Sequence, residues 1–179
     1  MNMENSQLRE NLEKLLKAYE YFFDVERDVQ VGSELLPAAA AYHFREENYV
    51  ATKAHTIYAT EQHEYAYFYV TEHLDLATLQ RLIELSREAG MARIEPHNEH
   101  MFSNVTLVIL ADVIDQDAKT ALKRYRYRKN FWLTLHGWME YHIAAMETST
   151  MSFLSNPAGK EARKTLEQNF KPARNKKGE

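Results

Sequence analysis

The sequence predicts an α+β fold: a mixed, mostly antiparallel sheet with helices packed mainly on one face, in the order α-βββ-α-β-α-ββ(β)-α. Three features predict it: an apolar stripe of helical period near the start, an alternating aromatic segment in the middle, and a later run that is apolar on both faces. The 179 residues are 45% hydrophobic and 27% charged, as in ordinary globular proteins. We expect one domain over residues 1–170 and a disordered basic tail over residues 171–179.

The first helix is predicted over residues 6–28. Its apolar side chains recur at steps of three and four, which places them on one stripe of a helix: Leu8, Leu12, Leu15, Leu16, Tyr19, Phe22 and Phe23. Gly32 and Pro37 then mark a loop, because glycine and proline both interrupt a helix.

An antiparallel meander of three strands is predicted over residues 38–71, where the apolar period changes to two. Strands are expected at 42–44, 49–58 and 64–71, with polar turns at 46–48 and 60–63. In the last strand, Tyr65, Tyr67 and Tyr69 share one face. Their hydroxyl groups allow that face to be partly wet.

The remaining elements alternate between helices and strands. Asp75 is placed to cap a helix that ends at Gly90, and residues 91–102 are irregular. Residues 105–111 are apolar on both faces, which is typical of a central strand. After it we expect a helix over 116–125, strands over 131–135 and 138–146 around Gly137, a short edge strand over 151–154, and a helix from about 156 to 170.

Composition excludes several classes of protein. There is no cysteine, so disulfide frameworks, thiolate zinc sites and cysteine nucleophiles are excluded. We find no secretory signal pattern, and the longest apolar stretch is much shorter than a membrane span. We therefore expect a cytoplasmic protein without a membrane partner.

The charges are unevenly distributed along the chain. Residues 1–100 hold 9 Lys and Arg against 18 Asp and Glu, whereas residues 101–179 hold 13 against 8. This asymmetry indicates either a basic surface for an anionic partner or attraction between the two halves, within one chain or between two copies.

One candidate metal site lies in the irregular segment before the central strand. His97, Glu99 and His100 supply two imidazoles and a carboxylate within four residues, and such groups bind divalent metals. Pro96 indicates a loop here, so these polar side chains could instead bond to their own backbone.

A candidate nucleic-acid-binding segment combines cations with aromatic rings. It consists of Lys123, Arg124, Tyr125, Arg126, Tyr127, Arg128 and Lys129. Cations neutralise phosphates and tyrosine rings can stack on bases. In the alternative interpretation, the tyrosines pack inward and the arginines remain solvated.

The order helix, three strands, helix, strand over roughly residues 6–111 resembles that of the PD-(D/E)XK nucleases. The resemblance implies an acid on the second strand and an acid-x-Lys motif on the third, which together hold Mg²⁺. Here the residues two after Glu64 and Glu72 are Ala66 and Leu74, so the motif is missing and the resemblance is limited to element order. Phosphate-binding glycine loops and the G-x-S-x-G elbow are also absent from the sequence.

These observations lead to three functional hypotheses. The first is a binding or regulatory module rather than an enzyme, without a cofactor, that forms a homo-oligomer through Tyr65, Tyr67 and Tyr69. The second is a nucleic-acid-associated protein that uses residues 123–129. The third is a metal-dependent hydrolase at His97, Glu99 and His100.

Overall fold

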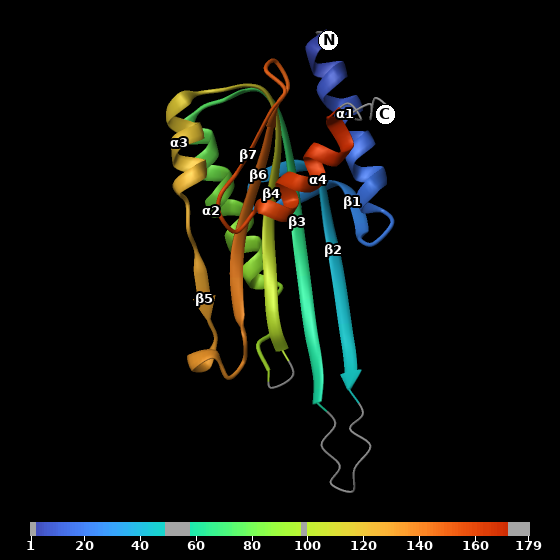
Figure 1. The fold of residues 1–179 in the computed structure, drawn as a ribbon, viewed down its shortest axis with the longest axis vertical. Helices are drawn as coiled ribbons and strands as arrows, with labels where there is room; N and C mark the ends of the chain where they lie inside the picture. Colours follow the sequence, from blue (N-terminus) through green and yellow to red (C-terminus); the bar gives the residue numbers. More distant parts are fainter. Residues whose placement is uncertain (1–2, 49–57, 98–99, 172–179) are drawn as a thin grey trace, which may run out of the picture.

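The computed structural model describes residues 3–48, 58–97 and 100–171, and these form a mixed sheet with helices around it (Figure 1). The elements are α1 (Met3–Tyr19), β1 (Asp24–Val31), β2 (Glu34–Asn48), β3 (Tyr58–Leu74), α2 (Leu76–Ala92), β4 (His100–Ile114), α3 (Gln116–Arg124), β5 (Arg128–Asn130), a 3-10 turn η1 (Trp132–Thr134), β6 (Trp138–Glu147), β7 (Ser152–Ser155) and α4 (Lys160–Phe170). The predicted α+β class and the order of elements are confirmed.

Within the described residues, seven strands form one sheet in the order β1-β2-β3-β4-β6-β5, with β7 also paired to β6. The pairs β3–β4 and β4–β6 are parallel, and the other pairs are antiparallel. The sheet is therefore mixed and mostly antiparallel, as predicted. The parallel pairs follow from the helices α2 and α3, because each carries the chain back to the starting end of the sheet.

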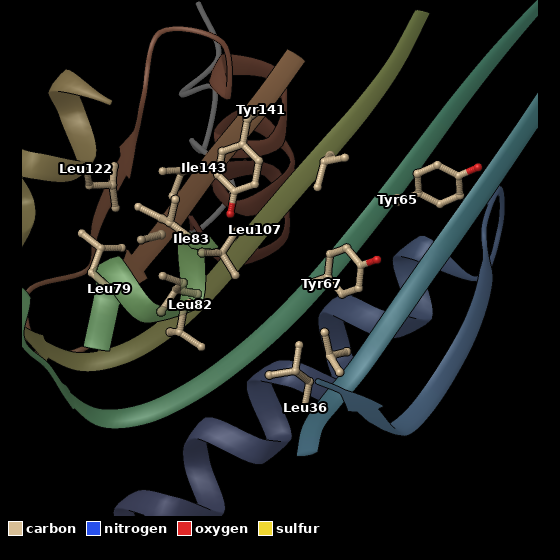
Figure 2. Packing of buried hydrophobic residues seen from close by; sticks show 14 of the residues in the cluster. Leu36, Tyr65, Tyr67, Leu79, Leu82, Ile83, Leu107, Leu122, Tyr141 and Ile143 are labelled. Atoms are coloured by element: carbon tan, nitrogen blue, oxygen red, sulfur yellow. The ribbon is translucent and has the colours of Figure 1, made fainter. Parts of the chain in front are cut away.

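The prediction that helices lie mainly on one face is wrong. Helices α2 and α3 cover one face, where Leu79, Leu82 and Leu122 pack on the strands (Figure 2). Helices α1 and α4 cover the other face, where Leu16 and Leu166 pack on a second set of strand residues. Both faces of the central strands are apolar, so each face needs its own covering layer.

Several predicted boundaries also change. Residues 24–31 form edge strand β1 rather than the end of the first helix, and the expected turns at 46–48 and 60–63 lie inside long strands that pair with each other. Residues 131–135 do not form a strand, because the backbone turns through positive φ at Trp132 and Leu133. The predicted strand at 49–58 and the predicted tail fall outside the described residues, apart from Tyr58 and Lys171.

The lower ends of β2, β3 and β4 extend beyond the helices (Figure 1). On the face of α1 and α4, the apolar cluster reaches Ala40, Ala66 and Val108 and no further toward this end. In the next row Tyr42 contacts Phe23, which follows α1, with ring centroids 5.4 Å apart, and the strand residues beyond this row extend past the described helices (Figure 1). This end of the sheet positions the candidate site.

Helix α2 approaches the sheet most closely at Gly90. A Cβ added there would lie 2.5 and 2.6 Å from the two γ-carbons of Val105 on β4. Both γ-methyl groups of Val105 would collide with the added Cβ, so rotation about χ1 of Val105 would not remove the steric clash. A residue without a side chain is therefore required at this contact.

We expect Gly90→Ala to lower the free energy of unfolding by about 1–3 kcal/mol through overpacking, although alanine favours helix formation. In a Val105→Ala background the same substitution should cost much less. Urea unfolding of the four variants tests this as a double-mutant cycle. A Gly90→Ala protein that is more stable than the parent would contradict the close contact.

Candidate functional site

The uncovered surface next to α1 and α4, here called the open face, is built from two rows of side chains that cross the sheet. The strand register places Tyr42, Glu64, Asn104, Glu140 and Arg128 in the first row. It places Phe44, Gln62, Phe102, Trp138 and Asn130 in the second row. Polar groups and aromatic rings therefore lie side by side on one surface, although they come from five separate strands.

The rings of the open face are arranged in pairs. Phe102 and Trp138 stack with ring centroids 5.7 Å apart and planes 22° apart. Tyr42 and Phe44 are nearly parallel at 6.5 Å. The guanidinium of Arg128 lies over the Trp138 ring, with 4.6 Å between its carbon and the ring centroid. This contact connects the open face to the edge strand β5.

Glu64 is the most buried carboxyl group of the open face. Thr106 donates a hydrogen bond of 3.0 Å to Oε1 of Glu64, and no cation among the described residues pairs with this carboxyl. Burial raises the pKa of Glu64, and the Thr106 hydrogen bond only partly opposes this shift. Burial therefore disfavours the charged form of Glu64, and a further hydrogen-bond donor would stabilise that form.

His142 on β6 pairs with Thr106 on β4, in the row of side chains between the first row of the open face and the helices. Burial lowers the pKa of His142, and Glu140, whose Oε2 is 3.8 Å from Nε2, acts in the opposite direction. Glu64 on β3, whose pKa is raised, and His142 on β6, whose pKa is lowered, thus lie on the two strands that flank β4. Such pairs of shifted groups are typical of binding and catalytic surfaces.

The predicted nucleic-acid segment lies along the sheet edge that β5 forms. Lys123, Arg124, Arg126, Arg128 and Lys129, here called the basic edge, are all exposed. Within residues 3–48, 58–97 and 100–171, none of them forms an ion pair with a carboxylate. Arg126 instead donates to backbone carbonyl groups, and Arg128 donates to Asn130.

The two tyrosines of this segment point inward, as the alternative interpretation had it. Arg87 on α2 donates to the Tyr125 hydroxyl, and its guanidinium lies over the Tyr127 ring at 4.9 Å. Tyr125 also meets the buried ring of Tyr141 edge-on. The rings of Tyr125 and Tyr127 therefore pack against α2 and the sheet, while the cationic side chains of the segment are exposed to solvent.

A shallow hollow of about 500 Å³ lies next to the basic edge. Arg126, Tyr127 and Arg128 line one side, and Pro157 and Ala158 line the other, with Glu140 also at its surface. The apolar turn that follows, formed by Trp132, Leu133 and Leu135, is strongly exposed; Leu133 is 92% exposed. Sequence reasoning missed these exposed side chains, because a strand was expected at 131–135.

The histidines gather on the opposite face of the same end of the sheet. The Nδ1 atoms of His43 and His63 are 2.7 Å apart, so one ring donates and the other accepts. Oε2 of Glu61 lies 3.5 Å from Nε2 of His63 and 3.1 Å from Nε2 of His97. Burial and the neighbouring His43 lower the pKa of His63, while Glu61 opposes the shift.

The predicted metal ligands do not form a preformed site in the described part of the chain. His100 uses both ring nitrogens: Nδ1 is 2.7 Å from the backbone oxygen of His136, and Nε2 is 2.8 Å from Oγ of Ser103. Glu99 lies outside the described residues. Among the residues that are described, no three His, Asp or Glu side chains are placed to hold one ion.

The expected tyrosine interface also needs correction. Tyr65 and Tyr67 are only 4% and 2% exposed and belong to the same buried cluster as Leu79 and Leu82 of α2; Figure 2 shows both rings beside β3. Tyr69 is half-buried against the same core. Tyr65 donates to the backbone oxygen of Arg93, so its hydroxyl is also used within the chain. Tyr65 and Tyr67 therefore offer almost no exposed surface to a second copy, and Tyr69 offers only part of its ring.

The chain was compared with known proteins. A family model described as "Domain of unknown function (DUF8052)" matches residues 7–168. No curated protein and no solved structure matches the chain. No helix within the described ranges is long and apolar enough to cross a membrane.

Acidification should lower the free energy of unfolding, partly through His63. An unfolded imidazole titrates near pH 6.5, and the pKa of His63 is lower than this in the folded chain. Below about pH 6.5 the unfolded state therefore binds the proton more readily, and stability falls until the folded pKa is also passed. The substitution His63→Gln should make this decline shallower in urea unfolding between pH 5 and 8.

His73 gives a control of opposite sign. It is exposed, and its hydrogen bond to Asp115 raises its pKa, so its protonation favours the folded state at low pH. The substitution His73→Gln should make the acid decline steeper. An unchanged pH profile in the His63→Gln protein would contradict the assigned direction.

Proposed function

The chain belongs to the DUF8052 family, and we propose that it is a binding protein that associates with nucleic acid through its basic edge. The observation that carries the proposal is a set of five exposed cations on one sheet edge that have no carboxylate partner in the described chain. Lys and Arg side chains in such an array bind phosphate groups and release counterions.

Cations elsewhere in the molecule are mostly paired. Arg27 contacts Glu13 and Glu20, while Lys119 contacts Glu147 at 2.7 Å. Carboxylates thus lie within ion-pair distance of most cations elsewhere in the described chain, whereas none lies within that distance of the basic edge. Unpaired like charges repel one another, and an external anion would relieve this repulsion.

The shape of the basic edge favours a polyanion over a small ion. Arg126 and Arg128 alternate with the inward tyrosines along an extended segment, so their backbones are about 7 Å apart on the same side. The cations continue upward onto the last turn of α3 at Lys123 and Arg124. A chain of phosphates can contact this line at several points, which a single small anion cannot do.

The other hypotheses have less support. The homo-oligomer stays a prediction, but Tyr65 and Tyr67, two of the three tyrosines on which it depended, are buried. The metal-dependent hydrolase would need ligands other than His100, whose ring nitrogens are both engaged. Nucleic acid is accessible to a cytoplasmic protein, the location expected from the sequence.

The triple substitution Arg124→Ala, Arg126→Ala and Arg128→Ala tests the proposal. We expect the full chain to bind a fluorescent 12-nucleotide RNA or DNA at 50 mM salt, and the triple variant to bind at least about tenfold more weakly. The slope of log K against log salt should shrink by about 2, because each lost phosphate contact to a single strand contributes about 0.7. Fluorescence anisotropy measures both quantities.

A charge-matched control removes three exposed cations from the helices instead: Lys14→Ala, Lys17→Ala and Lys164→Ala. It changes the net charge equally and should retain binding. The proposal fails if the parent protein binds no nucleic acid at 50 mM salt, or if the two triple variants bind alike. Binding to vesicles of anionic lipid without binding to oligonucleotides would instead assign the basic edge and the apolar turn to a membrane surface.

A further inference from the structure

We propose that the open face is a platform for unpaired bases, so that the nucleic acid bound by the basic edge is single-stranded. This inference rests on the proposed function, and it adds the class of nucleic acid and the surface that receives the bases. The carrying observation is the row of rings from Phe44, Phe102 and Trp138 on a sheet surface that adjoins the basic edge.

The three rings are accessible on the surface of the sheet. Phe44 is 39% exposed, while Phe102 and Trp138 are half-buried and stack on each other. None of the three lies in either apolar core cluster of the described chain. Aromatic rings on an exposed sheet surface can stack with any base, because every base has a π-face.

The rings lie close to the basic edge. Arg128 belongs to the basic edge, yet it lies in the same row as Glu140 and over the ring of Trp138. Adjacent strands are about 4.8 Å apart. A phosphate backbone held along β5 therefore lies only one to two strand spacings, roughly 5–10 Å, from the rings on β6 and β4. Bases attached to that backbone can reach the open face.

Polar groups that could contact a base lie in the first row of the open face. Thr106 donates to Oε1 of Glu64, and no described group donates to Oε2. Asn104 lies beside Glu64 in the same row and supplies an amide. A carboxylate oxygen accepts hydrogen bonds from the exocyclic amino groups of cytosine and adenine, which uracil and thymine lack. The open face should therefore prefer bases that carry an amino group.

A nucleic-acid duplex could not stack its bases on the aromatic rings of the open face. Its bases are stacked within the helix and their flat faces are inaccessible, so only the phosphates could contact the protein. A surface that used the basic edge alone would bind duplex and single strands with similar affinity. The difference between the two forms therefore separates the open face from the basic edge.

Anisotropy with labelled 12-mers of oligo(C), oligo(A) and oligo(U), and with a 12-base-pair duplex, tests the inference on the full chain. We expect oligo(C) to bind at least about tenfold more tightly than the duplex. Phe44→Ala should weaken oligo(C) binding at least about fivefold, since stacking contributes about this much per base. It should leave duplex binding unchanged. Leu35→Ala, at an apolar side chain that is 61% exposed near the start of β2 and nine residues along the strand from Phe44, is the control.

Two further readouts do not depend on the Phe44 variant. The chain has two tryptophans, so Trp132→Phe leaves Trp138 as the reporter, and oligo(C) should quench its fluorescence as bases stack nearby. Glu64→Gln should reduce the preference for oligo(C) over oligo(U). Its amide still offers an oxygen to Thr106, so the local fold is kept.

The outcomes separate the two proposals. If the Arg124, Arg126 and Arg128 variant loses binding but duplex and oligo(C) bind equally, the basic edge stands and the base platform is wrong. The same conclusion follows if Phe44→Ala and Leu35→Ala bind alike and the fluorescence of Trp138 is not quenched. If no oligonucleotide binds the parent protein, the proposed function itself fails.

Discussion

The structure depends on a mismatch between the lengths of its strands and its helices. An α-helix rises about 1.5 Å per residue, so the 17 residues of α2 span about 26 Å. A strand rises about 3.3 Å per residue, so the 17 residues of β3 span about 56 Å. A single helix on each face can therefore cover only about half of such a strand. The other half must have a different composition, because its side chains have no helix to pack against.

The side chains of β3 change from apolar to polar at the point where the covering helices end. Ala66 and Phe68 lie in the core that α1 and α4 cover, whereas Glu64 and Gln62 follow on the same face where the helices end. Strand β4 shows the same change on that face, from Val108 to Asn104. On the other face, Tyr65 is followed by His63 and the histidine group. Ionisable groups thus collect at one end of the sheet because the core stops there, and two different surfaces result.

Sequence reasoning predicted the parts of the fold that local periodicity determines. The run at 105–111 gave the central strand β4, and Asp75 does cap α2 through a hydrogen bond of 2.7 Å to the backbone of Thr78. Periodicity also separated the two faces of β3. It could not say what covers each face, so Tyr65 and Tyr67 were expected on a partly exposed surface and are instead buried.

The open face could not be predicted for a related reason. Its rows join residues from five strands, and two of the pairings are parallel and link segments that are far apart in the chain. No local pattern sets the register between Glu64 and Asn104 or between Phe102 and Trp138. In the basic segment, by contrast, alternation alone gave two interpretations. The structure selects inward tyrosines and outward cations, because Arg87 on α2 holds both rings.

The sheet order also explains how a chain of net charge −4 can present a basic surface. The acidic strand β1, with Asp24, Glu26 and Asp28, and the basic strand β5 lie at opposite edges. Five strand spacings of about 4.8 Å place them about 24 Å apart. This is more than twice the screening length of about 8–10 Å at physiological salt. The carboxylates of β1 are therefore too far away to pair with the cations of β5 or to cancel their field. A polyanion that approaches from that side meets the local charge rather than the net charge.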